Sequence, residues 1–125
     1  MICRSLVLTT LLSTFLLASL PAAAHEVLKG PHGGRVVEAG THHIELVVNS
    51  MTVDVFVTDA NDKVIPIAGY KGIAILTVGG RAQRIDLTAK DDRLSGTSPI
   101  ALPEQPNGVV QLTTPDGKTS QGRYH

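Results

Sequence analysis

The chain begins with a continuous apolar run, and the region after it mostly alternates between apolar and polar residues. Residues 6–20 carry no charge, follow Arg4 and precede the small residues Pro21-Ala22-Ala23-Ala24. A positive start, a short apolar stretch and a small-residue end are the three parts of a secretory signal peptide. The run is shorter than the roughly 20 residues that a membrane-spanning helix needs. We therefore predict that residues 1–24 are a cleaved signal peptide and that the mature protein has no stable membrane insertion.

The alternation beyond this segment has the period of strands. Residues 44–48 and 53–57 alternate between two faces, which is typical of half-buried strands. Residues 73–78 are almost continuously apolar, which favours a buried central strand, and residues 83–88 alternate again. Shorter strand candidates are residues 93–95, 100–102, 109–113 and 119–124.

Turn signals separate these segments at regular spacing. They are the polar residues 59–63, the pair Gly79-Gly80 and the tripeptide Pro115-Asp116-Gly117. About seven or eight short strands with such spacing predict an all-β fold, an antiparallel two-sheet sandwich of immunoglobulin-like type. A small closed barrel is the alternative. A mature chain of about 100 residues forms one domain, residues 35–125, behind a flexible arm rich in His and Gly at residues 25–34.

Composition excludes several classes of function. The only cysteine, Cys3, belongs to the predicted signal peptide, so the mature chain has no disulfide and no thiolate ligand. Eleven Lys and Arg residues balance eleven Asp and Glu residues, and no basic cluster marks a nucleic-acid face. Neither a G-x-S-x-G nor an H-E-x-x-H motif is present, and we predict that the protein is not an enzyme.

The histidines are the residues that suggest a specific function, the binding of a metal ion. Four of the five lie close together after the predicted signal peptide, namely His25, His32, His42 and His43. Imidazole is the commonest protein ligand for transition metals. We predict a divalent transition-metal site, with copper ahead of zinc or nickel, because a tetragonal set of nitrogen ligands suits Cu(II) best. We interpret Met51 as a turn residue and His125 as a frayed chain end.

His25 has two possible modes of binding. Cleavage after Ala24 makes it the first residue, whose amine and imidazole can chelate one ion together. Cleavage after Ala22 leaves Ala23-Ala24-His25, in which the amine, two backbone amides and the imidazole can surround a square-planar Cu(II) or Ni(II). Either cut makes His25 a predicted ligand.

The other predicted ligands lie in a glycine-rich turn and on a strand. His32 stands in Pro31-His32-Gly33-Gly34, where the glycines allow the backbone to fold around an ion. His42 and His43 point to opposite faces if the strand has begun there, so they do not share one ion easily. His43 and Glu45 share a face and offer a nitrogen and an oxygen, or Glu45 orients the imidazole from behind.

A resemblance to a known family supports this interpretation. The stretch GPHGGRVVEAG at residues 30–40, followed by Ile44-Glu45-Leu46-Val47, resembles a module of periplasmic adaptor subunits of heavy-metal efflux pumps of the resistance-nodulation-division class. Small stand-alone exported proteins of gram-negative bacteria look similar too, and they share the patterns at residues 59–69, 91–96 and 115–118. The resemblance covers most of the mature chain through short motifs.

The resemblance implies a periplasmic β-sandwich associated with tolerance to copper, zinc, cobalt or nickel, with His32 and Glu45 as the motif residues. It implies a metal efflux system or another envelope protein as partner. The chain lacks the coiled-coil and lipoyl-like segments with which a full adaptor bridges a pump and an outer-membrane channel. Two functions stay open: a periplasmic metal-binding protein, and an envelope interaction module that binds no metal.

Overall fold

The computed structural model describes residues 28–125; the predicted signal peptide and His25 lie outside the described residues. Within residues 28–125 the chain forms nine strands and no helix, so it contains no helix that could span a membrane. The strands are β1 (Leu28–Lys29), β2 (Arg35–Ala39), β3 (His42–Asn49), β4 (Thr52–Asp59), β5 (Lys71–Val78), β6 (Arg81–Lys90), β7 (Arg93–Thr97), β8 (Gly108–Thr113) and β9 (Thr119–Tyr124).

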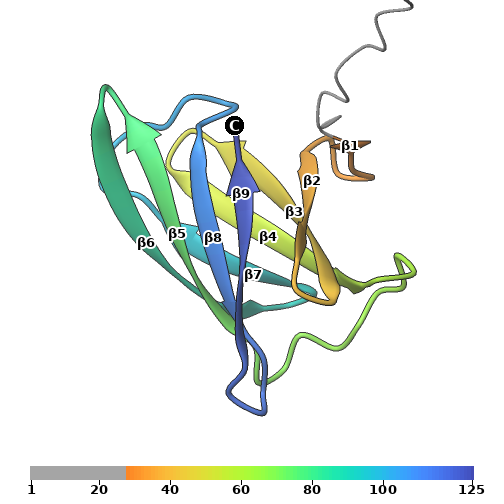
Figure 1. Cartoon of the computed structure of the whole chain (residues 1–125). Coiled ribbons are helices and arrows are strands. Elements are labelled where there is room, and N and C mark those ends of the chain that lie inside the picture. Colours follow the sequence, from red (N-terminus) through yellow and green to blue (C-terminus); the bar gives the residue numbers. More distant parts are fainter. Residues whose placement is uncertain (1–27) are drawn as a thin grey trace, which may run out of the picture.

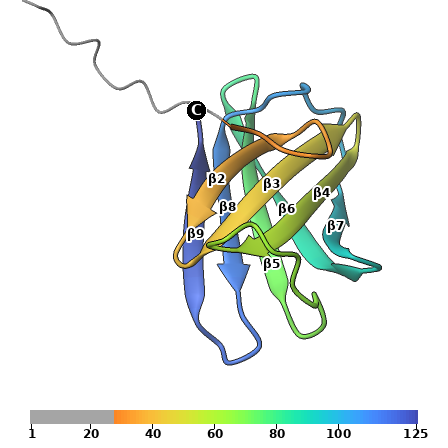
Figure 2. The same cartoon turned by 90° about the vertical axis from the view of Figure 1, so that its right-hand side faces the viewer.

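All nine strands belong to one antiparallel sheet with the order β1-β2-β3-β4-β7-β6-β5-β8-β9. Figure 1 shows that the sheet curls, so that β5, β6, β8 and β9 face β2, β3 and β4. Figure 2 shows the same curl from the side of β2. The prediction of an antiparallel all-β fold is confirmed.

The predicted division into two separate sheets is not what the hydrogen bonding gives. Strand β7 pairs with β4 at four register positions and with β6 at three, and it thereby joins the two halves into one sheet. Sequence periodicity does not reveal such a join, because a short strand that pairs on both edges has the same alternation as an edge strand.

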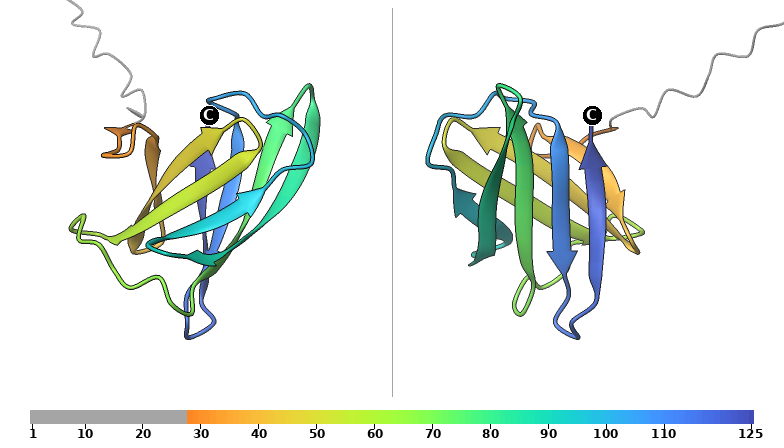
Figure 3. Two further views of the ribbon diagram at one scale, coloured as in Figure 1. Left: turned by 180° about the vertical axis from the view of Figure 1, so that it is seen from behind. Right: turned by 60° about the vertical axis from the view of Figure 1, so that its left-hand side comes forward.

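Alternation along the strands builds the core between the two halves. On β3, Ile44 and Leu46 are buried inside the curl, while His43 and Glu45 point to the outer face. The two views of Figure 3 show that the strands of the other half lie across from β3. Buried residues of those strands complete the core. The buried apolar residues are Ala39, Ile44, Leu46, Val53, Val55, Val57, Ile67, Ala74, Leu76, Ile85, Leu87, Leu94, Leu102, Val110, Leu112 and Tyr124.

The predicted turns form where the sequence placed them. Gly79 and Gly80 have φ angles of 55° and 77°, as a two-residue hairpin between β5 and β6 requires. The Asp59 carboxylate accepts hydrogen bonds from the backbone N–H groups of Lys63 and Asn61, which lower its pKa. The predicted strand at residues 100–102 is wrong: this segment is a loop, in which Leu102 donates its backbone N–H to the Ser50 carbonyl.

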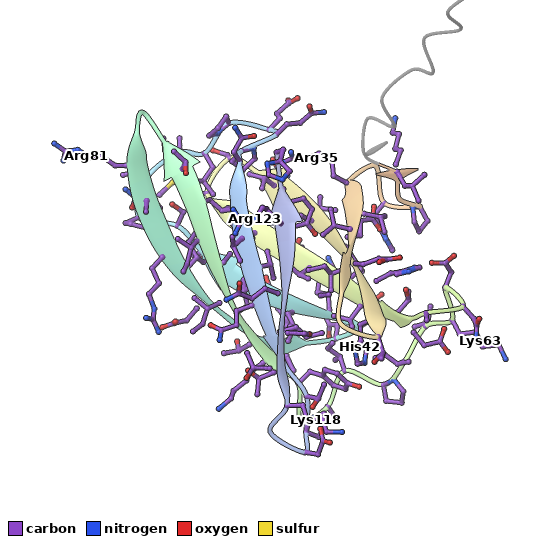
Figure 4. All side chains as sticks on the ribbon, in the orientation of Figure 1. Arg35, His42, Lys63, Arg81, Lys118 and Arg123 are labelled. Carbon is purple, nitrogen blue, oxygen red and sulfur yellow. The ribbon has the colours of Figure 1, made fainter. Side chains whose placement is uncertain are left out.

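Side chains close the curl where β2 lies beside β9. Arg35 donates hydrogen bonds to the carbonyl oxygens of Pro106 and His125, and its guanidinium lies 5.2 Å from the centre of the Tyr124 ring. Figure 4 shows Arg35 beside the end of β9. The Tyr124 hydroxyl donates to the Ile44 carbonyl at 2.9 Å, and burial raises the pKa of this hydroxyl. We call this contact between β2 and β9 the seam; it is formed by the Arg35 guanidinium and the Tyr124 ring.

Candidate metal centre

The described part of the predicted arm folds back onto the sheet instead of extending freely. Leu28 pairs with Val36 in the β1–β2 ladder. Residues 30–34 form a tight loop, closed by a 2.8 Å hydrogen bond from the Gly30 N–H to the Gly34 carbonyl. This loop lies on the outer face of β3 and covers Glu45.

Glu45 is the residue that holds the loop. Its side chain points to the outer face of the sheet, yet the residue is only 4% exposed. The carboxylate accepts hydrogen bonds from the backbone N–H groups of His32 and Gly34, each at 2.9 Å. A third bond joins it to His32 Nδ1 at 2.7 Å. A buried charge is tolerated when it is satisfied in this way, because hydrogen bonds replace its lost hydration.

Gly30 and Gly34 lie so close to β3 that a side chain at either position would collide with it. A Cβ atom on Gly30 would lie 2.2 Å from Cδ of Glu45, and one on Gly34 would lie 2.3 Å from the Leu46 carbonyl oxygen. The second contact is with backbone, which cannot move without disturbing the β2–β3 ladder. The shared pattern of glycines, His32 and Glu45 therefore has a structural explanation that needs no ion.

The same contacts leave one nitrogen of His32 available. A carboxylate ion can only accept a hydrogen bond, so a neutral imidazole bonded to it carries its proton on Nδ1 and its lone pair on Nε2. The His32 side chain is 44% exposed. A carboxylate behind an imidazole is the usual arrangement at protein metal sites.

Phe56 fixes the plane of the His32 ring. The two rings stack with centroids 3.6 Å apart and an interplanar angle of 5°. Phe56 lies opposite Glu45 in the β3–β4 register, on the same outer face. The guanidinium of Arg93, on β7, lies 5.0 Å from the centre of the Phe56 ring and is held by Asp54 and Asp92 at 3.6 Å and 3.1 Å.

His43 lies on the same face and lines the same cavity as His32. This cavity has a volume of about 470 Å³, and its walls include the apolar residues Leu28, Val36, Phe56 and Val64. His43 Nδ1 lies 2.6 Å from Asp62, and Nε2 lies 3.8 Å from Glu38. These two carboxylates stand at opposite edges of the ring, so they do not form one chelating set with it.

His42 points the other way, as strand alternation requires. Its Nε2 lies 3.3 Å from the Tyr70 hydroxyl, and the two rings meet edge to face at 5.7 Å. It lines a separate cavity of about 510 Å³ with residues of the β8–β9 turn, including Asp116 and Lys118. Figure 4 shows His42 at the beginning of β3, on the side where Lys118 of this turn lies. His42 therefore does not share a cavity with His32 and His43.

The structure brings three of the predicted ligands to one cavity and places a fourth elsewhere. His32 and His43 share a cavity, Glu45 stands behind His32, and His42 lies elsewhere. In residues 28–125, no three His, Cys, Asp or Glu side chains group closely enough to hold an ion. The predicted ligand His25 lies outside the described residues.

Sequence reasoning missed Phe56, Asp62 and Arg93. One signal was present: Phe56 follows Thr52 and Asp54 on the outward-facing set of β4, where an aromatic residue is out of place on a solvated surface. Asp62 has a φ angle of 62°, a conformation that asparagine and aspartate tolerate better than most residues, but its contact with His43 depends on the path of a loop.

Comparison with known proteins adds no assignment. No protein-family model, no curated protein and no solved structure matches the chain. The resemblance to the efflux adaptors stays a prediction from the residues at positions 30–47.

Proposed function

We propose that this is an exported, periplasmic protein that binds a divalent transition metal and buffers it or passes it to an efflux system. One observation carries the proposal: the buried Glu45 carboxylate engages Nδ1 of His32 at 2.7 Å, and the His32 side chain is 44% exposed. A ring fixed in this way loses little freedom when it binds an ion, which favours affinity.

His32 is the primary ligand in this proposal, and Glu45 acts behind it. Three hydrogen bonds already occupy the Glu45 oxygens, so direct ligation by Glu45 would release the loop that presents His32. His43 joins the ion by turning away from Asp62. His42 is not part of this set, because it lies on the opposite face of β3.

The predicted ligand His25 fits the same set by its position in the chain. It precedes Leu28 by three residues, and three residues span at most about 11 Å. Leu28 itself lines the cavity shared by His32 and His43. An amino-terminal amine and three imidazoles make a nitrogen-rich set that suits Cu(II) first, and Zn(II) or Ni(II) next.

Titration of the purified mature protein with Cu(II) and Zn(II) at neutral pH tests the proposal. We expect one equivalent to bind, and His32→Ala to weaken binding by at least tenfold. His125→Ala, at the other end of the chain, is the matched control and leaves the affinity unchanged. Binding is expected to weaken as the pH falls through the range in which imidazoles take up a proton. Equal affinities for wild type and His32→Ala would refute the site.

A second function is favoured by the apolar walls of the same cavity. Leu28 and Val64, at its rim, are 60% and 80% exposed. Exposed apolar residues around a concave surface are typical of interaction sites. If the protein is an envelope interaction module, Val64→Asp will abolish capture of its partner, and a chelator will leave capture unchanged.

A further inference from the structure

We propose that Phe56 is a positioning residue for the His32 imidazole, and that it sets the direction in which Nε2 faces a bound metal. The inference rests on the proposed function, since it concerns the same ligand. It adds a residue of β4 that neither the glycine-rich motif nor the histidine pattern contains.

The geometry requires a second constraint on the ring. The hydrogen bond from Nδ1 to Glu45 at 2.7 Å fixes the position of one ring atom. It leaves the imidazole free to swing about the line that joins Nδ1 to the carboxylate oxygen, and such a swing moves Nε2 through an arc. Stacking at a centroid separation of 3.6 Å and an angle of 5° removes that freedom, because the ring cannot leave the plane parallel to Phe56 without losing the contact.

Phe56 is itself held in place. It is half-buried on β4, opposite Glu45 in the register, so the two groups that orient His32 stand side by side on paired strands. Arg93 lies 5.0 Å from the centre of the Phe56 ring, and both Asp54 and Asp92 hold its guanidinium. An arginine so held favours a fixed aromatic face, as cation–π contacts do.

A flexible ligand and a fixed one differ in what binding costs them. A side chain that must be immobilised by the metal loses rotational freedom at that moment, and the affinity is lower by that amount. Groups that orient a metal ligand without touching the ion commonly change affinity by about ten- to a hundredfold. We expect the lower end of this range for Phe56, since Glu45 still holds Nδ1 in its absence.

The test compares Phe56→Leu with Phe56→Tyr, which keeps the stacked ring. Long-range ¹H–¹⁵N NMR of the metal-free mature protein reports the His32 tautomer and the ring-current shift of its ring protons. Titration with Zn(II) alone reports the affinity. Thr52→Val, an exposed outward position on β4 that does not line this cavity, is the control for a general change of the surface.

The proposal predicts a single His32 tautomer with upfield-shifted ring protons in wild type, Phe56→Tyr and Thr52→Val. In Phe56→Leu the upfield shift disappears and zinc affinity falls about tenfold, with an unchanged thermal midpoint of unfolding showing that the fold is intact. The proposal would be overturned if Phe56→Leu kept the wild-type ring-proton shifts and zinc affinity. It would also be overturned if Phe56→Tyr lost zinc affinity about tenfold. If His32→Ala abolishes binding while Phe56→Leu does not change it, only this inference fails. If wild type binds no zinc, copper or nickel, the proposed function fails, and this inference fails with it.

Discussion

The two outer faces of the curled sheet follow the same alternation but differ in what covers them. On the half formed by β5, β6, β8 and β9, charged side chains stay exposed: Arg84 and Asp86 stand 3.7 Å apart at 67% and 80% exposure. On the half formed by β2, β3 and β4, the outward-facing Glu45 is buried beneath the loop at residues 30–34. Once a loop covers an outward-facing strand position, the residue there is no longer interchangeable with other polar residues, because every buried polar atom needs a hydrogen-bond partner.

Removing a carboxylate should show the largest difference in the free energy of unfolding between the two faces. Glu45→Ala leaves the backbone N–H groups of His32 and Gly34 without their charged acceptor. We expect a loss of about 3 kcal/mol in the free energy of unfolding, and weaker metal binding. Asp86→Ala on the other face should change the unfolding free energy by less than about 0.5 kcal/mol. Urea denaturation measures both, and similar values would contradict the comparison.

Replacing a glycine by alanine should also have different effects on the stability of the two halves. A methyl group on Gly34 meets the Leu46 carbonyl oxygen at 2.3 Å, so Gly34→Ala should destabilise by about 1–3 kcal/mol and displace the loop from Glu45. A methyl group on Gly79, in the β5–β6 hairpin, meets open space, and its φ of 55° alone makes Gly79→Ala costly by about 1 kcal/mol. Metal titration should separate the two variants most clearly: Gly34→Ala weakens binding, and Gly79→Ala leaves it unchanged.

The seam between the halves predicts a dependence of stability on alkaline pH. Burial raises the pKa of Tyr124 above its ordinary value of 10.0, so above that pH the unfolded chain releases a proton that the folded chain retains. Stability contributed by the protonated hydroxyl is fully present below about pH 10 and falls as the pH rises beyond it. Tyr124→Phe should remove this decline while losing about 1 kcal/mol with its hydrogen bond to Ile44. A decline that persists in Tyr124→Phe would show that another group causes it.

The smallest change in the free energy of unfolding is expected for exposed polar contacts, which both halves of the sheet carry. Asp62 is 76% exposed although it contacts His43 at 2.6 Å. Asp62→Asn should therefore change the free energy of unfolding by less than about 1 kcal/mol, as should Arg84→Gln on the other half. A markedly larger loss for Asp62→Asn, measured by thermal unfolding, would mean that the β4–β5 connection depends on this contact.

The fold could be predicted from sequence to the level of its strands and turns, because alternation and turn residues are local signals. Ile44 and Leu46 on one face and His43 on the other follow directly from the period of two. The joining of the halves through β7 could not be predicted, since pairing on both edges is a long-range property. The predicted strand at residues 100–102 failed because Leu102 enters the core from a loop.

The candidate site was predictable only in part. His32 and Glu45 stood out as motif residues, and the separation of His42 from His43 followed from strand geometry. That Glu45 is buried behind His32 could not be foreseen, because an outward-facing glutamate is normally solvated. The position of Phe56 under the imidazole depends on how residues 28–34 fold back, which no local pattern specifies.

The short strand β7 has a mechanical consequence. Among residues 28–125 it supplies the ladder that crosses from β4 to β6, with four register pairs on one edge and three on the other. The two halves of the sheet are therefore joined by a short ladder at β7 and only by side chains at the opposite edge, where β2 lies beside β9. Separation of the halves would begin at the β2–β9 edge, with β7 as the hinge.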